Sequence, residues 1–485
     1  MRSAAIITLA CLVLAACAAK PKPDLRLPAA YEAPASAATV ALDRWWEVFG
    51  DPQLTGLVDQ ALVANPDAKS AAARLREARA SRVSALSQFL PQGDLNASAT
   101  RTDTNQIEGS IPIPIPGFAI QGGVSKAYSA NFDVSWEVDL FGRLFAARRA
   151  ANADVAAAGF DYQATRASLA AQVADAYFQA RGLAIQLADA QESARIQREL
   201  YELTSKRAQA GLAPSSEPDR VAGDLAQSEA RVAGLEADLQ AQRRTLLILA
   251  GRTWEPTAAV DVQPFVAAAP AIPASLPSDL LRRRPDVRSA EAQLAGAAGR
   301  QDVARLALLP TFTLQPGLGW SKSKQSGAVF ESSNWSIGGS LFQPVLDIPN
   351  LLAQARVYGA RTQAAAANYE KAVQTAFSEA EGALVRLDAD RRRVALLTDG
   401  EARAQRAYRA ARLGYSLGLN DLETTLSAEQ AWRATRTQLT DAQVQAVRRA
   451  VQAFKAVGGG WPGAEGGAGP RAASPPQRER RDVTG

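Results

Sequence analysis

Apolar and polar side chains alternate most regularly over residues 128–138. The apolar set falls on one face of an extended chain, and its members are Tyr128, Ala130, Phe132, Val134, Trp136 and Val138. The polar set falls on the other face, and its members are Ser129, Asn131, Asp133, Ser135 and Glu137. Because successive side chains of a strand point to opposite faces, the pattern predicts a strand with one apolar and one polar face. Its length is close to the roughly 9–11 residues of a tilted membrane-crossing strand, although a strand of a soluble sandwich has the same pattern.

The order of elements occurs twice along the chain. Pro66-Asp67 recurs as Pro285-Asp286, and Leu90-Pro91 recurs as Leu309-Pro310, in each case 219 residues later. In both copies a helix that starts at a proline runs to a second proline, where an alternating segment begins. Each copy therefore predicts one helix followed by two strands. The first pair of strands has the longer connection, which contains an Ile-Pro repeat over residues 111–117 that cannot pair as a central strand.

After each pair of strands the apolar period becomes helical. A helix of roughly 68 residues would be on the order of 100 Å long, which no compact domain requires. The helix that returns from it in the first copy has apolar residues seven positions apart, as in a coiled coil: Leu225, Val232, Leu239 and Leu246. The predicted organisation comprises a signal peptide (1–16), a lipidated tether (17–40), a first repeat (41–260; hairpin 94–138, long helix 143–210, return helix 216–250), a second repeat (261–457; helix 286–309, hairpin 311–345, long helix 351–413, return helix 421–456) and a disordered tail (458–485).

The N-terminus has the features of a secretory signal. Arg2 precedes an apolar run over residues 4–16, and Cys17 follows it. Residues 14–17 resemble a bacterial lipoprotein box, in which cleavage leaves Cys17 as the lipidated first residue; an ordinary signal peptide with an incidental cysteine is the alternative. Cys11 would leave with the signal, so the mature chain could form no internal disulfide. Lipoproteins kept in the inner membrane often carry aspartate after the cysteine, so the resemblance implies that Ala18 favours sorting to the outer membrane.

Composition excludes several classes of function. The chain has no histidine, which rules out histidine catalysis and histidine-ligated metal sites. A formal charge of +5 over 485 residues is too small to indicate a nucleic-acid partner. The acids near helix starts, such as Asp51, are better explained as helix caps than as acid–base pairs. We expect no catalytic residue, no metal and no cofactor.

Four strands are too few to close a barrel by themselves. Open edges would expose N–H and C=O groups to lipid at a cost of several kcal/mol each. Three protomers would supply twelve strands, enough to surround a lumen. We therefore predict a mixed α and β membrane protein with an internal duplication, in which a 12-stranded trimeric β-barrel continues into a long α-helical periplasmic barrel. The polar face of residues 129–137 would line the lumen. The opposite face would turn five aromatic residues towards lipid or towards the girdles at the membrane interfaces: Phe132, Trp136, Phe312, Trp320 and Trp335.

Several motifs carry a family resemblance. In chain order they are Trp45-Trp46, Phe49-Gly50-Asp51, Asn65-Pro66-Asp67, Trp136-Glu137-Val138-Asp139-Leu140-Phe141-Gly142-Arg143 and Arg283-Arg284-Pro285-Asp286. Their order over about residues 40–457 resembles the TolC-like outer membrane factor family, and the lipoprotein box resembles its NodT-type lipoprotein branch. The resemblance implies a homotrimeric channel in contact with outer-membrane lipid. It also implies a periplasmic adaptor and an inner-membrane pump, usually of the resistance–nodulation–division type, as partners in the efflux of drugs or other small molecules.

In such proteins the turns between long and return helices form the periplasmic tip. The residues expected to dock the adaptor are Arg207, Gly211, Leu212, Ser215, Leu413, Gly414, Gly418 and Leu419. The candidate gate residues are Asp219, Asn420, Asp421 and Glu423, whose acids could form rings at a constriction. Helix capping by the glycines and a helix-dipole role for the acids are the structural alternatives. Where the family often has Leu-Asp-Ala-Gln, this chain has Leu426-Ser427-Ala428-Glu429.

Three other functions compete with efflux. The outer-membrane duct of a type I protein secretion system would use the same tube with a different pump. A lipid-tethered coiled-coil scaffold would place the strands in a periplasmic sandwich. An enzyme is disfavoured because the sequence offers no histidine and no paired acids.

Overall fold

The computed structural model describes residues 23, 25–32, 42–104, 123–212, 214–272, 277–325 and 328–460. Its helices and strands, in chain order, are η1 (Trp45–Phe49), α2 (Pro52–Ala64), α3 (Pro66–Ser87), β1 (Gln92–Thr104), β2 (Gly123–Val138), α4 (Arg143–Gln209), α5 (Ser216–Leu249), η2 (Thr257–Ala259), η3 (Pro277–Asp279), α6 (Leu280–Arg283), α7 (Pro285–Leu306), β3 (Thr311–Gln325), β4 (Ala328–Phe342), α8 (Ile348–Ser416) and α9 (Leu422–Ala456). The predicted lipidation at Cys17, the Ile-Pro loop and most of the predicted tail lie outside the described residues.

These elements belong to two compact units. The first contains the four strands and the adjoining helical segments within Arg74–Ala158 and Ala290–Tyr369. The second contains the remaining helices within Asp24–Ala73, Gly159–Ser289 and Glu370–Gly485. The long helices α4 and α8 contribute residues to both units.

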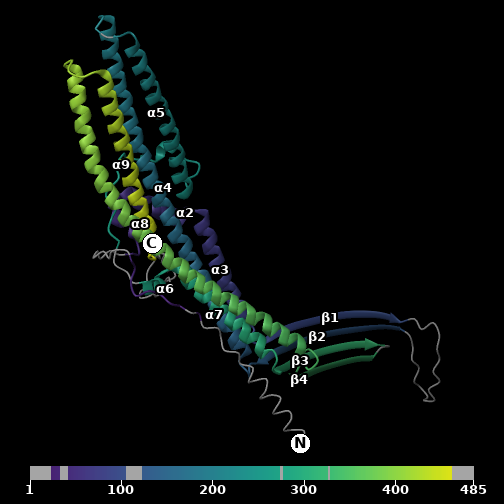
Figure 1. Ribbon diagram of the computed structural model, residues 1–485. Coiled ribbons are helices and arrows are strands. Elements are labelled where there is room, and N and C mark those ends of the chain that lie inside the picture. Colours follow the sequence, from purple (N-terminus) through teal and green to yellow (C-terminus); the bar gives the residue numbers. More distant parts are fainter. Residues whose placement is uncertain are drawn as a thin grey trace, which may run out of the picture. The chain divides into compact units, whose positions relative to one another are not determined.

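The four strands form one antiparallel sheet in the order β1-β2-β3-β4 (Figure 1). Each neighbouring pair is antiparallel, and the second and third strands join the two copies of the repeat. The predicted mixed α and β architecture, with two strands from each copy and long helices, is thereby observed. In the described residues the sheet has two edge strands, β1 and β4.

Helices α4, α5, α8 and α9 run alongside one another in the second unit (Figure 1). Their main core surrounds Trp45, whose ring is fully buried and stacks on Phe454 at 5.6 Å between centroids. Asp51 accepts hydrogen bonds from the backbone N–H groups of Gln53 and Leu54 and so caps α2. It also accepts a hydrogen bond from Arg181 at 2.7 Å. An aromatic core and a cap that is anchored to α4 thus join the N-terminal helices to the long ones.

Equivalent side chains in the two copies make equivalent contacts. Asn65 donates from Nδ2 to the carbonyl oxygen of Leu249, the last residue of α5, at 3.0 Å. Arg284, 219 residues later, donates from Nη1 to the carbonyl oxygen of Ala456, the last residue of α9, at 3.2 Å. The last carbonyls of a helix have no partner within the helix. Each copy therefore uses the residue before its Pro-Asp pair to satisfy the end of its own return helix.

The glycines that follow the return helices repeat the same equivalence. Gly251 and Gly458 have φ angles of 75° and 85°, a left-handed conformation that other residues adopt only with strain. A Cβ on Gly251 would lie 3.0 Å from the carbonyl carbon of Ala64, and one on Gly458 would lie 3.0 Å from that of Arg283. Close backbone packing at these points requires glycine in both copies.

In the part of the chain that is described, no helix is long and apolar enough to cross a membrane.

Candidate channel wall and helical tips

The register of the sheet gathers most of the large apolar residues of the four strands on one face; the exceptions in the described strands are Phe330 and Phe342 of β4. Phe132 pairs with Leu95 on one side and with Leu318 on the other, and Leu318 pairs with Trp335. Side chains two residues apart on a strand share a face. Trp136, Trp320 and Phe312 therefore lie on the same face as these paired residues. The five aromatic residues predicted to share the lipid-facing side therefore do lie on one face of the sheet.

Small polar side chains occupy the opposite face. Asp94 pairs with Asp133, Asn96 with Asn131, and Ser98 lies 2.9 Å from Ser129 between hydroxyl oxygens. On β3 the polar face carries glycine: a Cβ on Gly319 would lie 2.5 Å from Oδ1 of Asn334 and 3.0 Å from Oδ1 of Asn131. Glycine at this position leaves room for the amide side chains of the strands on both sides.

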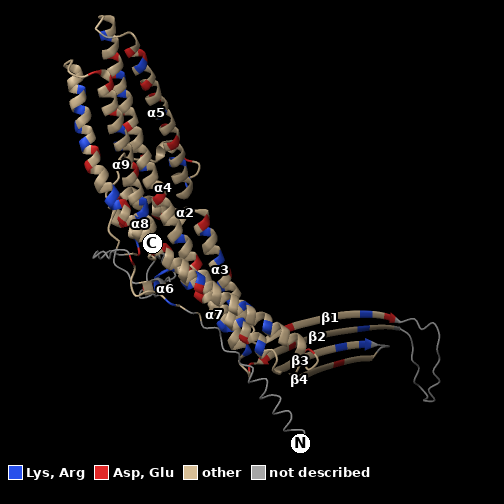
Figure 2. Cartoon of the chain, in the orientation of Figure 1, with Lys and Arg blue, Asp and Glu red and all other residues tan. Residues whose placement is uncertain are grey.

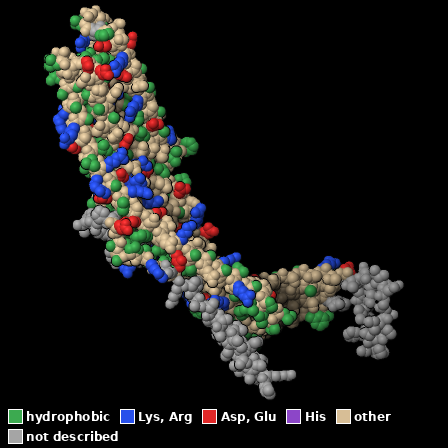
Figure 3. Space-filling model, viewed as in Figure 1, with side chains coloured by type: hydrophobic (Ala, Val, Ile, Leu, Met, Phe, Trp, Pro, Cys, Tyr) green, Lys and Arg blue, Asp and Glu red, His purple; other side chains and the backbone are tan. Residues whose placement is uncertain are grey.

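Both faces and both edges of the sheet are exposed in the single chain. All fifteen residues of β4 are exposed, and on the apolar face Leu95, Trp335 and Ile337 have 72%, 76% and 71% of their surface accessible. Figure 3 shows hydrophobic side chains on the strands and at the ends of the helices. An apolar surface of this extent on a sheet with unpaired edges is typical of a region that another surface covers.

The motif at 136–143 builds the passage from strand to helix. Glu137 and Arg143 form an ion pair with N–O distances of 2.5 and 3.2 Å. Asp139 accepts a hydrogen bond from the backbone N–H of Phe145 in the first turn of α4, and Gly142 has a φ angle of 83°. Trp136 donates from its indole to the carbonyl oxygen of Phe89 at 3.1 Å. Glu137, one of the polar residues predicted to line the lumen, forms this ion pair within its own chain.

The two helical tips have the same backbone geometry. At the first tip Gly211 has a φ angle of 72°, and Leu212 donates its N–H to the carbonyl of Arg207 at 2.8 Å. At the second tip Gly418 has a φ angle of 75°, and Leu419 donates its N–H to the carbonyl of Gly414 at 2.8 Å. Both are Schellman motifs, in which a left-handed glycine ends the helix and satisfies its last carbonyls.

Contacts between the tips involve residues predicted for docking. The guanidinium of Arg207 on α4 lies 4.9 Å from the ring centroid of Tyr415 on α8. Leu212, Leu413 and Leu419 point into solvent, with 71%, 61% and 77% of their surface accessible. Ser215 is exposed and makes no side-chain cap to α5. The tips therefore present apolar side chains in a region held together by the Arg207–Tyr415 contact.

Gly414 differs from its predicted place in the second turn. Helix α8 continues to Ser416, so Gly414 is buried within its last turn. A Cβ there would collide with Nδ2 of Asn420. The glycine thus makes room for the side chain of Asn420, which folds back over the helix end and donates to the carbonyl oxygen of Ala411 at 3.4 Å.

The candidate gate residues are exposed at helix starts. Asp421 is the N-cap of α9 and accepts the N–H of Thr424 at 2.7 Å. Hydrogen bonding to Thr424 holds the pKa of Asp421 below its usual value. Asp219 and Glu423 lie in the first turns of α5 and α9, where the helix dipole favours acids. Asp421 therefore acts as a helix cap, and this role leaves its carboxylate charged.

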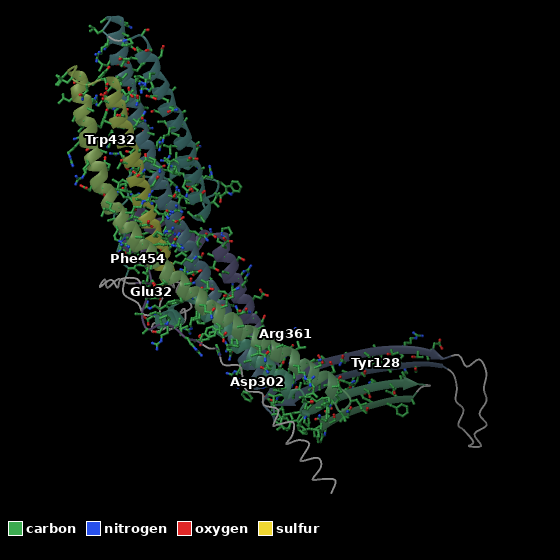
Figure 4. The ribbon with its side chains drawn as sticks, in the orientation of Figure 1. Glu32, Tyr128, Asp302, Arg361, Trp432 and Phe454 are labelled. Carbon is green, nitrogen blue, oxygen red and sulfur yellow. The ribbon has the colours of Figure 1, made fainter. Side chains whose placement is uncertain are left out.

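A second apolar cluster lies between the tips and the main core. Trp432 on α9, labelled in Figure 4, stacks on Tyr408 of α8 at 5.2 Å between centroids. Next to it Glu429 is fully buried, accepts a hydrogen bond from Gln197 at 2.6 Å and lies 3.4 Å from Nε of Arg433. Burial raises the pKa of Glu429 to about 7. The sequence marks Glu429 only as a departure from a family pattern and carries no sign of its burial.

An open pocket of about 1160 Å³ lies beside this cluster. Its lining includes Arg231 from α5, Arg412 from α8 and Arg436 from α9, with Asp189 of α4 accepting from Arg436 at 2.7 Å. Burial raises the pKa of Asp189 despite this partner. Among the described residues no group of acids or cysteines has the arrangement of a metal site.

Comparison with known proteins identifies the family. The family model of the outer membrane efflux protein matches residues 57–252 and 276–459, one match to each copy of the repeat. The chain belongs to the outer membrane efflux protein family. It is 30% identical to the pyoverdine export outer membrane protein OpmQ of Pseudomonas aeruginosa over 95% of this chain and 97% of that protein.

Two other members extend the comparison. The chain is 27% identical to nodulation protein T of Rhizobium leguminosarum bv. trifolii, over 89% of this chain and 92% of that protein. A solved structure of the outer-membrane channel OprN is 30% identical and superimposes with a TM-score of 0.77, covering 91% of this chain and all of that one. The predicted family, outer-membrane location and efflux role are confirmed, as is the fold class.

Proposed function

We propose that three copies of this efflux protein form a closed 12-stranded wall in the outer membrane. The observation that carries the proposal is the four-stranded sheet, which exposes an apolar face, a polar face and two unpaired edges. Pairing β1 of one protomer with β4 of the next would remove all edges and turn the apolar face to lipid. The polar face would then line a water-filled lumen.

Drugs or other small molecules would pass through this lumen passively, without enzymatic chemistry. A periplasmic adaptor would dock at the tips through the exposed leucines and Arg207, and an inner-membrane pump of the resistance–nodulation–division type would supply the energy. Acylated Cys17 would anchor each protomer to the membrane. Service in a type I secretion system remains the alternative, because the same tube would fit either pump.

The wall can be tested on the purified full chain. We expect extraction only with detergent, a heat-sensitive trimer on gels and ion conductance in planar bilayers. In the Cys17→Ala variant the protein should stay in the membrane, because the strands hold it there. Release of this variant by a salt wash, as a monomer, would support the lipid-tethered scaffold and contradict the channel.

The acids at the tips are proposed to narrow the periplasmic entrance. Replacing Asp219 and Asp421 together by Asn removes two charges per protomer, while an asparagine side chain can still cap α9. We expect higher single-channel conductance because the counter-ions and hydration water held by the charged ring no longer obstruct the entrance. Glu217→Gln, in the same first turn as Asp219, is the matched control. Equal conductance of the double variant and the wild type would remove these acids from the gate.

A further inference from the structure

The apolar face of the sheet ends in a row of cations. Arg101 on β1 pairs with Lys126 on β2, and Lys126 pairs with Lys324 on β3. Each lies six residues beyond the apolar row of Leu95, Phe132 and Leu318, an even number, and so shares its face. Figure 2 shows Lys and Arg on β1 and β3 towards the strand ends that lie away from the helices. We call Arg101, Lys126 and Lys324 the cationic row.

The cationic row lies at a fixed distance from the apolar row of Leu95, Phe132 and Leu318. Six residues of strand correspond to about 20 Å along the strand. Between the two levels lie Tyr128, marked in Figure 4, and Trp320. Amphipathic aromatic rings of this kind are enriched where a membrane meets water. The cationic row therefore lies beyond these aromatic residues, with Lys322 between Trp320 and Lys324 on β3, at the level expected for lipid headgroups.

The row carries positive charge that the chain does not neutralise. The neighbouring cation Lys322 pairs with Glu331 at 2.9 Å, and Glu331 also accepts from the indole of Trp320. Among the described residues no carboxylate forms an ion pair with Arg101, Lys126 or Lys324, all of which are exposed. Asp103 follows on the same face of β1, nearer the strand end, and makes no such pair within the described chain.

Like charges directly opposite each other on neighbouring strands destabilise a sheet. Here two such pairs are adjacent, so that three cations lie across three strands whose spacing is about 4.8 Å. An anion with several oxygens can contact two or three of these side chains at once, and a guanidinium binds phosphate through two parallel hydrogen bonds. Binding of an external anion would relieve the repulsion between the three cations.

We propose that the cationic row binds the phosphate groups of a lipid in the outer leaflet of the outer membrane. A lipid is the occupant because the row shares its face with the apolar band, where acyl chains would cover Leu95, Phe132 and Leu318. A dissolved anion in transit would instead meet the polar face. The proposal rests on the proposed function, since it requires the sheet to lie in the membrane with its helix-distal end outside.

The test uses the full-length trimer in neutral detergent micelles. Bisphosphorylated lipid A is added, and bound lipid is counted by native mass spectrometry. We expect the R101Q/K126Q/K324Q variant to bind lipid A at least about tenfold more weakly than the wild type, because three charged contacts are lost. The charge-retaining R101K/K126R/K324R variant should bind within about twofold of the wild type. K371Q/R406Q/R409Q, which neutralises three exposed cations of α8, should also match the wild type.

Two results would overturn the proposal. One is equal lipid A binding by the neutral row variant and the wild type. The other is complete displacement of the lipid by millimolar inorganic phosphate, which would make the row a site for the free ion. Failure of the proposed function is separable, because the trimer and bilayer conductance of the wild type are measured on the same preparation. The neutral row variant should retain both, and K126Q alone provides a milder variant if the triple one does not assemble.

Discussion

Glu429 illustrates how one side chain acquires properties that its neighbours impose. It is fully buried, hydrogen-bonded to Gln197 and close to Arg433. The nearby guanidinium groups of Arg433 and Arg412 favour its charged form, and the nearby carboxylate of Asp224 opposes it. Burial outweighs these charges. The free energy lost when the carboxylate leaves water exceeds the electrostatic stabilisation that the partly exposed arginines provide. The result is an acid that titrates near neutral pH in the interior of the helical unit.

A pH-dependent stability follows for Glu429. Its pKa is about 7 in the folded chain and near the ordinary value of 4.5 when unfolded. The folded state thus binds the extra proton, and the free energy of unfolding falls as pH rises from about 4.5 to 7. Glu429→Gln should therefore raise the free energy of unfolding at pH 8 by up to about 3 kcal/mol, and the melting temperature with it. At pH 4.5 the substitution should raise neither quantity.

Melting curves at both pH values, followed by circular dichroism, measure this difference. Glu423→Gln changes an exposed acid of the same helix and serves as control. An equal effect of Glu429→Gln at both pH values would contradict the assignment.

The helical tips show how an element places apolar side chains in water. Left-handed Gly211 and Gly418 end their helices in the same way, and each is followed by an exposed leucine. A leucine at this position can pack against its own helix, but Leu212 and Leu419 keep 71% and 77% of their surface accessible. Exposed apolar side chains at equivalent places in both copies are suited to a partner that contacts the two tips in the same way.

The proposed adaptor docking can be tested at these leucines. Leu212→Asp together with Leu419→Asp should abolish co-purification of the periplasmic adaptor, because apolar contact area is replaced by charge. The melting temperature should not change, since both side chains are exposed. Leu396→Asp, on α8 and 76% accessible, is the matched control. Undiminished adaptor binding by the double variant would remove the leucines from the docking surface.

At the scale of the whole molecule, the duplication determines how one chain can contribute to a wall. Both copies place two strands in one sheet, and both use the residue before Pro-Asp to hold the end of the return helix. The polar face of the sheet consists mainly of small hydroxyl, amide and glycine residues, and it carries the opposed acids Asp94 and Asp133. In a trimeric wall these two positions supply six carboxylates to one level of the lumen.

This level should influence ion selectivity. Asp94→Asn with Asp133→Asn should lower the preference of the channel for cations, because fixed negative charge attracts counter-ions into a pore. The measurement is the reversal potential in planar bilayers under a potassium chloride gradient. Ser98→Ala with Ser129→Ala alters the neighbouring row without changing charge. A reversal potential that is the same in the aspartate double variant and the wild type would show that selectivity is set elsewhere.

The sequence by itself determined the fold class, the duplication and the family. These depend on local periodicity: alternation of period two specifies the strands, heptad spacing specifies the helix pairs, and prolines and glycines mark the ends. The shared face of Phe132 and Trp335 was predictable for the same reason.

Only the tertiary structure decided which distant residues meet. The contacts of Gln197 with Glu429, Arg207 with Tyr415 and Arg284 with Ala456 join positions that lie far apart in the chain. The same holds for the cationic row, where Lys126 meets Lys324 through the register of β2 on β3. Periodicity states which way a side chain points, but burial, charge pairing and the resulting pKa values depend on what the fold places opposite it.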